Sequence, residues 1–339
     1  MINDSRITMK DIAGKCGYTV NTVSRALRDD PALPESTRSL IQNTAREMGY
    51  IRNSMASTLR SGRSNIIAVI VNDLHNQHFC DLLNRMDQEL RKENYNLMIL
   101  CMQLDDSLAE KMVHTAISLS VDGILYFPNY DHKKYLDYMI SNRMPFVLLD
   151  RRVEQLEADN VRCDDWQGGY LAGNHLADLG HRKFLFLSGV SKNSSQIERL
   201  GGFLQAIRER NIPESSVRII PGEEIEAALA NGSFDEYLFP LDYTAIVSFR
   251  DEVSYQVLHV LHEKGISVPG DISLISFDNL SAENPALSKL TSIYTAKDNI
   301  AVIGVKLLLE RIRDPSLPPR NVILPVRIYD GGTTAPPRE

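Results

Sequence analysis

Residues 8–27 constrain this chain most, because they contain two short amphipathic patterns separated by a glycine. Apolar residues recur at helical spacing over 10–16, and a second helix is predicted over 20–27. Gly17 provides the permissive backbone that a tight turn between helices needs, and Thr19 suits the N-cap of the second helix. The pattern predicts a helix-turn-helix, whose second helix is suited to enter the major groove of DNA.

The predicted outer face of the second helix is polar, with Asn21 and Arg25 near the helix start. A surface helical hairpin would show the same local pattern. A third helix, predicted over 35–48 after Pro34 and ended by Gly49, favours a complete small domain instead. The predicted apolar core of this domain includes Leu40, Ile41, Thr44, Ala45, Met48, Tyr50 and Ile51.

The first two predicted helices resemble the DNA-binding signature of the lactose-repressor (LacI/GalR) family at residues 11–13, Gly17 and residues 22–25. The resemblance extends to residues 45–51 and to the positions that follow them. The resemblance implies that Arg25 contacts a guanine, Asn21 an adenine and Val20 a thymine methyl group. The full set of DNA contacts that it implies is Thr8, Thr19, Val20, Asn21, Thr22, Arg25, Arg28, Thr37, Tyr50, Asn53, Ala56 and Leu59.

The predicted domains are a DNA-binding headpiece over 1–52, a linker over 53–64 and an effector-binding body over 65–339. The linker has a helical register only at 54–59, which is too short to hold a helix alone in water. Two interpretations stay open for it. It is either a flexible tether or, as the resemblance implies, a hinge helix that folds on DNA and places Leu59 in the minor groove.

Charge is distributed unevenly along the chain, whose net charge is −7. Residues 1–64 contain ten basic and six acidic residues, and the remainder contains 27 basic and 38 acidic residues. A basic headpiece on an acidic body suits a DNA-binding protein whose body should not bind phosphates.

The chain has no apolar run long enough to span a bilayer, and its polar start does not read as a signal peptide. We therefore expect a cytoplasmic protein without a membrane partner. Its four cysteines lack metal-binding spacing and lie in apolar contexts, which predicts buried free thiols. They are Cys16, Cys80, Cys101 and Cys163.

From residue 65 onward, short apolar strands alternate with amphipathic helices, which predicts parallel sheets covered on both faces. Strands are expected over 66–71, 97–101, 123–127, 146–149, 183–187, 245–248, 272–277 and 322–328. Helices are expected over 78–93, 107–118, 135–142, 166–179, 195–210, 252–264 and 300–313. A second set of strands and helices begins near Trp166, so the predicted fold is an α/β body of two lobes, each with an open parallel sheet. It resembles the periplasmic-binding-protein fold of the family's effector domains.

Ligands bind at the carboxyl ends of parallel strands, and polar residues follow the predicted strands at those places. The candidate effector-binding residues are Asn76, His78, Phe79, Asp150, Arg151, Ser195, Arg199, Arg250 and Asp278. The resemblance implies that Arg199 and Asp278 clamp sugar hydroxyls, and we expect them to do so across the closed lobes. It also implies that Phe79 stacks on a sugar face. Each residue also fits ordinary loop polarity at a sheet edge.

Three positions depart from the family pattern: His78 replaces an aromatic residue, Arg250 an asparagine and Thr295 a glutamine. Three arginines aimed at one cleft favour an anionic effector, such as a sugar phosphate or a sugar acid. A purine effector is disfavoured, because His78 replaces the tyrosine that stacks on it.

Catalytic motifs are missing from the sequence: no glycine-rich nucleotide fingerprint follows a strand, and no phosphate-binding loop or nucleophile elbow occurs. We expect no enzyme activity, no cofactor and no metal, and we assign His175 and His181 to packing. The expected protein is a homodimeric, allosteric repressor that binds a pseudo-palindromic operator and a carbohydrate-like effector. Two alternatives are a sugar-binding module without DNA function and an enzyme that converts sugars or nucleosides.

Overall fold

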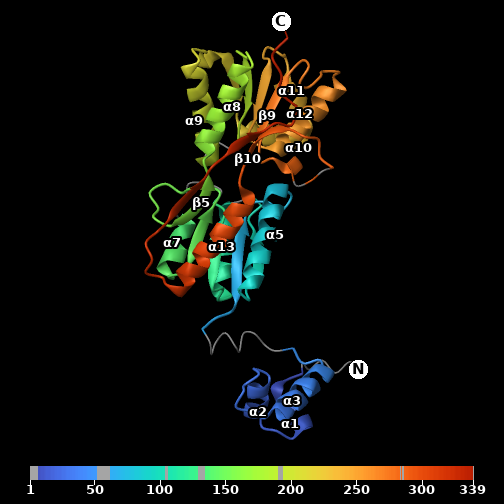
Figure 1. The fold of residues 1–339 in the computed structure, drawn as a ribbon, viewed down its shortest axis with the longest axis vertical. Helices are drawn as coiled ribbons and strands as arrows, with labels where there is room; N and C mark the ends of the chain where they lie inside the picture. Colours follow the sequence, from blue (N-terminus) through green and yellow to red (C-terminus); the bar gives the residue numbers. More distant parts are fainter. Residues whose placement is uncertain are drawn as a thin grey trace. The chain divides into compact units, whose positions relative to one another are not determined.

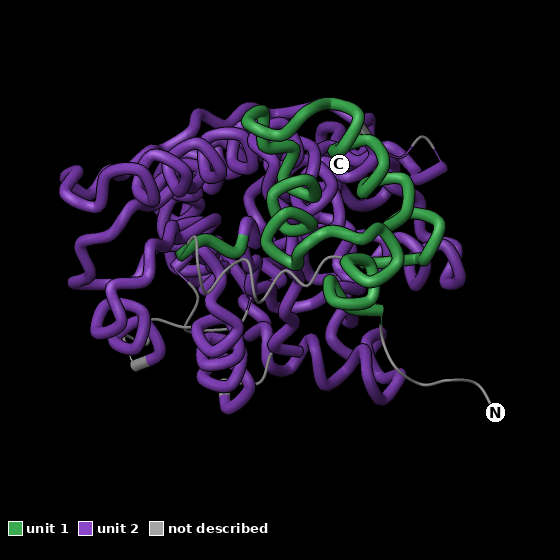
Figure 2. The backbone as a smooth tube through the Cα atoms, turned by 90° about the horizontal axis from the view of Figure 1, so that it is seen from below, with its two compact units in different colours: residues 1–64 green, residues 65–339 purple. Residues whose placement is uncertain are grey.

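The computed structural model describes residues 7–51, 62–103, 106–128, 134–189, 194–282, 284 and 286–338. The chain forms two compact units, Met1–Ser64 and Asn65–Glu339 (Figure 2). Most of the predicted linker, including Asn53, Ala56 and Leu59, lies outside the described residues.

Three helices build the first unit, as predicted: α1 (Met9–Cys16), α2 (Val20–Ala26) and α3 (Glu35–Glu47). The residues predicted to end α1 and to begin α2 have these roles in the structure. Gly17 takes the left-handed conformation with φ +72° after α1, and the side chain of Thr19 accepts a hydrogen bond from the Thr22 amide at the start of α2. The buried core consists of Ile12, Ala13, Val23, Ala26, Ile41 and Ala45.

Two predicted core residues of this unit are exposed: Leu40 by 50% and Ile51 by 73%. Ile41 already occupies the face of α3 that meets the other helices, so its neighbour Leu40 points outward. Tyr50 closes the core from the chain after α3, and Ile51 lies beyond it. The prediction was wrong here because three short helices bury only a narrow stripe.

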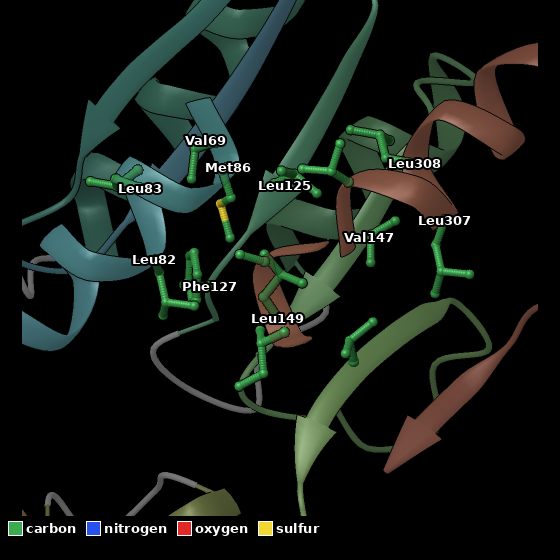
Figure 3. Packing of buried hydrophobic residues seen from close by; sticks show 14 of the residues in the cluster. Val69, Leu82, Leu83, Met86, Leu125, Phe127, Val147, Leu149, Leu307 and Leu308 are labelled. Atoms are coloured by element: carbon green, nitrogen blue, oxygen red, sulfur yellow. The ribbon is translucent and has the colours of Figure 1, made fainter. Parts of the chain in front are cut away.

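The first lobe of the second unit contains one fully parallel sheet in the order β11-β5-β4-β3-β1-β2. Its strands are β1 (Ile66–Val71), β2 (Asn96–Cys101), β3 (Gly123–Tyr126), β4 (Phe146–Leu149), β5 (Asp159–Cys163) and β11 (Asn321–Leu324). Its helices are α5 (Gln77–Lys92), α6 (Asp106–Ser118), α7 (Lys134–Ser141) and α13 (Lys297–Arg313). Helices α5 and α13 cover one face, where Leu307 and Leu308 lie near Val147 and Leu125 (Figure 3), and α6 and α7 cover the other.

The second lobe repeats this plan with the strand order β12-β10-β9-β8-β6-β7, in which β12 alone runs antiparallel. Its strands are β6 (Phe184–Leu187), β7 (Val217–Ile220), β8 (Ala245–Ser248), β9 (Ser273–Phe277), β10 (Thr291–Tyr294) and β12 (Arg327–Tyr329). Its helices are α8 (Asp165–Asp178), α9 (Ser194–Glu209), α10 (Gly222–Asn231), α11 (Phe234–Leu238) and α12 (Asp251–Glu263). Helices α8 and α9 cover one face, and α10, α11 and α12 cover the other.

The chain passes between the lobes three times, from β5 to α8, from β10 to α13 and from β11 to β12. The third passage corrects the prediction of one strand over 322–328. Pro325 has no amide hydrogen for a sheet ladder, so the strand ends at Leu324 and the chain resumes in the other sheet at Arg327. Figure 1 shows this red segment running from one lobe into the other.

Two smaller expectations concern the cysteines and membrane-spanning helices. All four cysteines are free, but only Cys163 is buried; the other three are partly exposed because each lies at an element edge. Among the described residues, no helix is long and apolar enough to cross a membrane.

Candidate functional sites

The polar face of α2 is accessible in the first unit. Val20 and Asn21 at the start of α2 are exposed, and Arg25 one turn later is partly exposed. The other described residues of the predicted DNA-contact set are also at least partly exposed; they are Thr8, Thr19, Thr22, Arg28, Thr37 and Tyr50. These side chains are available to a partner, whereas Val23 and Ala26 on the opposite face form the core.

An acidic residue that the sequence analysis missed orients the predicted base-reading arginine. The Nε atom of Arg25 donates to Asp30 Oδ2 at 2.8 Å, and this hydrogen bond lowers the pKa of the Asp30 carboxyl. Arg38 on α3 donates to the Asp30 carbonyl, which ties the loop after α2 to the third helix. This hydrogen bond uses Nε of the guanidinium, whereas bidentate recognition of guanine, the predicted role of Arg25, needs two donors.

All nine predicted effector-binding residues line one cavity of about 90 Å³ in the second unit. The first lobe contributes the ends of β1 and β4 and the first turn of α5, and the second lobe contributes α9 and the ends of β8 and β9. The sequence analysis missed four further lining residues, Asn72, Asp73, Glu226 and Phe249. Glu226 was missed because α10 itself was not predicted from the sequence.

A buried histidine–carboxylate pair forms the first-lobe wall of the cavity. His78 Nε2 lies 3.0 Å from Asp150 Oδ2. Burial opposes the charged imidazolium, but the Asp150 carboxylate outweighs burial, so the pKa of His78 is raised. Burial likewise opposes the Asp150 carboxylate, but His78 and the arginines Arg151 and Arg199 lower the pKa of Asp150 to about 2. The contact therefore favours the charged form of both groups.

Arg199 is held by the second lobe from several sides. Its Nε donates to Asp165 Oδ1 at 2.7 Å and its Nη1 to the Phe249 carbonyl at 2.7 Å, while Asp278 lies 3.8 Å from Nη2. The guanidinium also lies between the rings of Phe249 and Phe277. Arg199 and Asp278 both belong to the second lobe, so the expected clamp across the lobes is wrong. Arg199 lies on α9, which follows β6, and Asp278 follows β9, and these two strands belong to the same sheet.

The other cavity arginines also have acceptors. Arg250 pairs with Glu226 at 2.6 Å and with Glu252 at 3.4 Å, and Arg151 donates to the Pro128 carbonyl at 3.0 Å. The lining thus combines three guanidinium groups with four carboxylates, those of Asp73, Asp150, Glu226 and Asp278. The positive and negative groups of the lining largely compensate one another.

Both central carboxylates of the cavity sit on left-handed backbone, with φ +69° at Asp150 and φ +93° at Asp278. Non-glycine residues rarely adopt this conformation, and those that do often belong to functional sites. Beneath Asp278, the buried Asp251 accepts hydrogen bonds from the Leu280 amide and the Ser292 hydroxyl. Burial together with Asp278 raises the pKa of Asp251 to about 7.

The two histidines that were assigned to packing do pack. His181 is buried and contacts the hydroxyls of Thr244 and Ser273, and His175 contacts the Thr334 hydroxyl. Among the described residues, no group of three or more histidine, cysteine or acidic side chains is arranged to hold a metal ion.

Comparisons with known proteins match both units. Residues 8–53 match the family "Bacterial regulatory proteins, lacI family", and residues 174–334 match "Periplasmic binding protein-like domain". The repressor PurR of Actinobacillus pleuropneumoniae is 26% identical over 90% of this chain and 91% of its own length. The regulator DegA of Bacillus subtilis is 28% identical over 85% of this chain and 86% of its own length.

Solved structures show the same fold. A LacI family regulator from Enterococcus faecium with bound ribose has a TM-score of 0.69 and 27% identity, over 80% of this chain and all of its own. A lac repressor dimer bound to operator and an anti-inducer has a TM-score of 0.80 over 98% of this chain and all of its own. At 20% identity, this second likeness supports the fold alone.

Proposed function

This chain is a DNA-binding transcriptional regulator of the LacI family, and from that premise we propose that a carbohydrate-like effector controls its affinity for an operator. The observation that carries the proposal is the meeting of all nine predicted effector residues in one cavity. The exposed face of α2 would read the operator, and two chains would bind its two half-sites as a dimer.

The chemistry of the cavity favours a polyhydroxylated effector without net charge. Its wall contains both carboxylates and guanidinium groups, so the hydroxyls of a ring would find acceptors and donors. Ribose is the ligand in the Enterococcus faecium relative, which is consistent with this choice. A sugar phosphate or sugar acid is the second candidate, because three guanidinium groups line the same small space. An anion would have to compete with Glu226 for Arg250.

Effector binding must be coupled to movement of the lobes or of the cavity side chains. The cavity of about 90 Å³ is well below the roughly 300–1,000 Å³ of typical ligand sites. A ring therefore enters when the lobes separate or when the Arg250–Glu226 pair shifts. The effector changes operator affinity only to the extent that it binds one arrangement more tightly than the other.

The test uses the full chain with DNA from upstream of its own gene. A thermal-shift screen of sugars, each paired with its phosphate or acid, identifies a ligand, and a gel shift then measures its effect on DNA binding. We expect Asp278→Asn to abolish the ligand response while DNA binding persists, and the exposed Asp298→Asn to change neither. A ligand response without any DNA binding would contradict the proposal and support a sugar-binding module.

A further inference from the structure

Outside the effector cavity, one carboxylate joins the two lobes. Glu198 on α9 of the second lobe accepts a hydrogen bond from Arg152 Nε through Oε1 and another from Arg162 Nη1 through Oε2, both at 2.9 Å. Arg152 lies in the loop after β4 and Arg162 on β5, so both arginines belong to the first lobe. Each oxygen of one carboxylate therefore holds a different segment of the opposite lobe.

This group is shielded from solvent more than a surface ion pair. The side chains of Glu198 and Arg162 are only 16% and 13% exposed, and that of Arg152 is 44% exposed. Surface pairs contribute little because water screens them, whereas partly buried pairs with direct hydrogen bonds contribute more. Removing the Glu198 charge would leave two guanidinium groups at the lobe boundary without their carboxylate.

The position of the group relates it to the cavity. Arg152 follows the cavity residue Arg151, and Glu198 precedes the cavity residue Arg199. Arg162 lies directly before the β5-to-α8 passage between the lobes. Each of these two segments thus places one residue at the cavity and an adjacent residue against the opposite lobe. A change in the spacing of the lobes therefore alters both the cavity and the Glu198 contacts.

Two backbone amides report on contact between the lobes. The Arg152 amide donates to the Ser194 hydroxyl at 3.2 Å, and the Gln77 amide donates to Glu252 Oε1 at 3.1 Å. Gln77 is the first residue of α5, where the amide has no partner within the helix. Its protection from exchange therefore depends on Glu252 of the other lobe, and it lies outside the Glu198 group.

We propose that Glu198 is a positioning residue that holds the lobes together through Arg152 and Arg162. These contacts come from the chain's own side chains, so they contribute to closure whether or not an effector is bound. A consequence follows that rests on the proposed function. Glu198 sets how far an effector can shift the equilibrium between open and closed lobes.

The test is hydrogen exchange of the full chain at single-residue resolution, without DNA or sugar, in the unchanged protein and in Glu198→Gln. We expect the Gln77 and Arg152 amides to exchange about fivefold faster in the variant, equivalent to about 1 kcal/mol. Amides within β3 and β8 should keep their protection, which shows that both lobes stay folded. Arg152→Gln should give the same pattern if Glu198→Gln does not fold.

Glu209→Gln is the matched control, because Glu209 lies on the same helix and bonds Tyr170 and Gln205 within the second lobe. It should leave both reporter amides unchanged. An effect of Glu198→Gln on Arg152 alone, with Gln77 unchanged, would overturn the proposal and leave Glu198 a local contact. Because this measurement uses neither DNA nor effector, a chain that failed to bind an operator would overturn the proposed function without affecting the result.

Discussion

His78 and Asp150 show how single residues give the cavity its electrostatic character. His78 is buried and Asp150 is partly buried, and burial alone would favour the neutral form of both. Their close contact reverses this preference, because each charge stabilises the other in a low-dielectric site. His78 and Asp150 therefore give this part of the cavity wall a polar character.

The raised pKa of His78 predicts a pH-dependent stability. A raised pKa in the folded state stabilises the protein fully below the ordinary value of 6.5, and this contribution is lost as the pH rises through the raised value. The difference in thermal unfolding midpoint between the unchanged protein and His78→Gln should therefore shrink between pH 6 and pH 9. A difference that stays constant over this range would show that folding does not raise the pKa of His78.

Arg25 is the residue on which base reading depends most. Arg25→Ala should cost roughly 1–3 kcal/mol of operator binding and relax the preference at one base pair in each half-site. Asp30→Asn, which leaves the arginine but removes its orienting carboxylate, should relax the same position less. Binding titrations against single-base operator variants measure both effects. An equal loss on all sequences would mean that Arg25 contacts phosphate only.

At the scale of elements, α8 and α9 pack with almost no space between their backbones. A Cβ atom at Gly202 would lie 1.9 Å from the Trp166 carbonyl oxygen, and one at Gly169 would lie 1.9 Å from the Arg199 carbonyl oxygen. Gly169 and Gly202 thus permit close helix packing. That packing places Arg199 beside Asp165 at the start of α8.

Neighbouring glycines on α9 provide a matched pair of substitutions. Gly202→Ala forces the two helices apart and should destabilise the second unit by about 1–3 kcal/mol or more. Gly201→Ala meets only a Trp166 ring carbon at 3.9 Å, so the better helix propensity of alanine should leave stability unchanged or raise it by up to ~1 kcal/mol. Denaturant unfolding of both variants measures the difference. Equal stabilities would contradict the packing argument.

Patterns along the sequence predicted the elements whose signal is local, and missed those whose stability comes from partners elsewhere. Strands β1 and β6 are continuous apolar runs and were predicted. Strand β5 has the mixed sequence 159–163, and its buried Asp159 is paired with Arg311 and Arg320 from the end of the chain. The same limit applies to the cavity. Strand ends identified the nine lining residues, but the pairing of Arg250 with Glu226 depends on a helix that no periodicity predicted.

At the scale of the whole molecule, the uneven charge is divided between the two compact units. Leu59 lies in the predicted linker, outside the described residues, and its role remains a prediction. Leu59→Ala should weaken operator binding and DNA bending while leaving effector affinity unchanged, because an apolar wedge contributes only when DNA is bound. Gel shifts and calorimetry measure the two properties. Leu119→Ala, at an exposed leucine of the body, is the control, and unaltered DNA binding by Leu59→Ala would support the tether.

The late return of α13 and β11 to the first lobe has a consequence for biosynthesis. A growing chain has made β1 to β5 by residue 163, but the sheet lacks its edge strand and one covering helix until residue 324. Until then, the core face that Ile300 and Leu308 will cover stays exposed. The second lobe gains β12 only three residues later. Both lobes are therefore completed almost together, after residue 324, and a nascent chain must keep two unfinished sheets from aggregating until these strands are made.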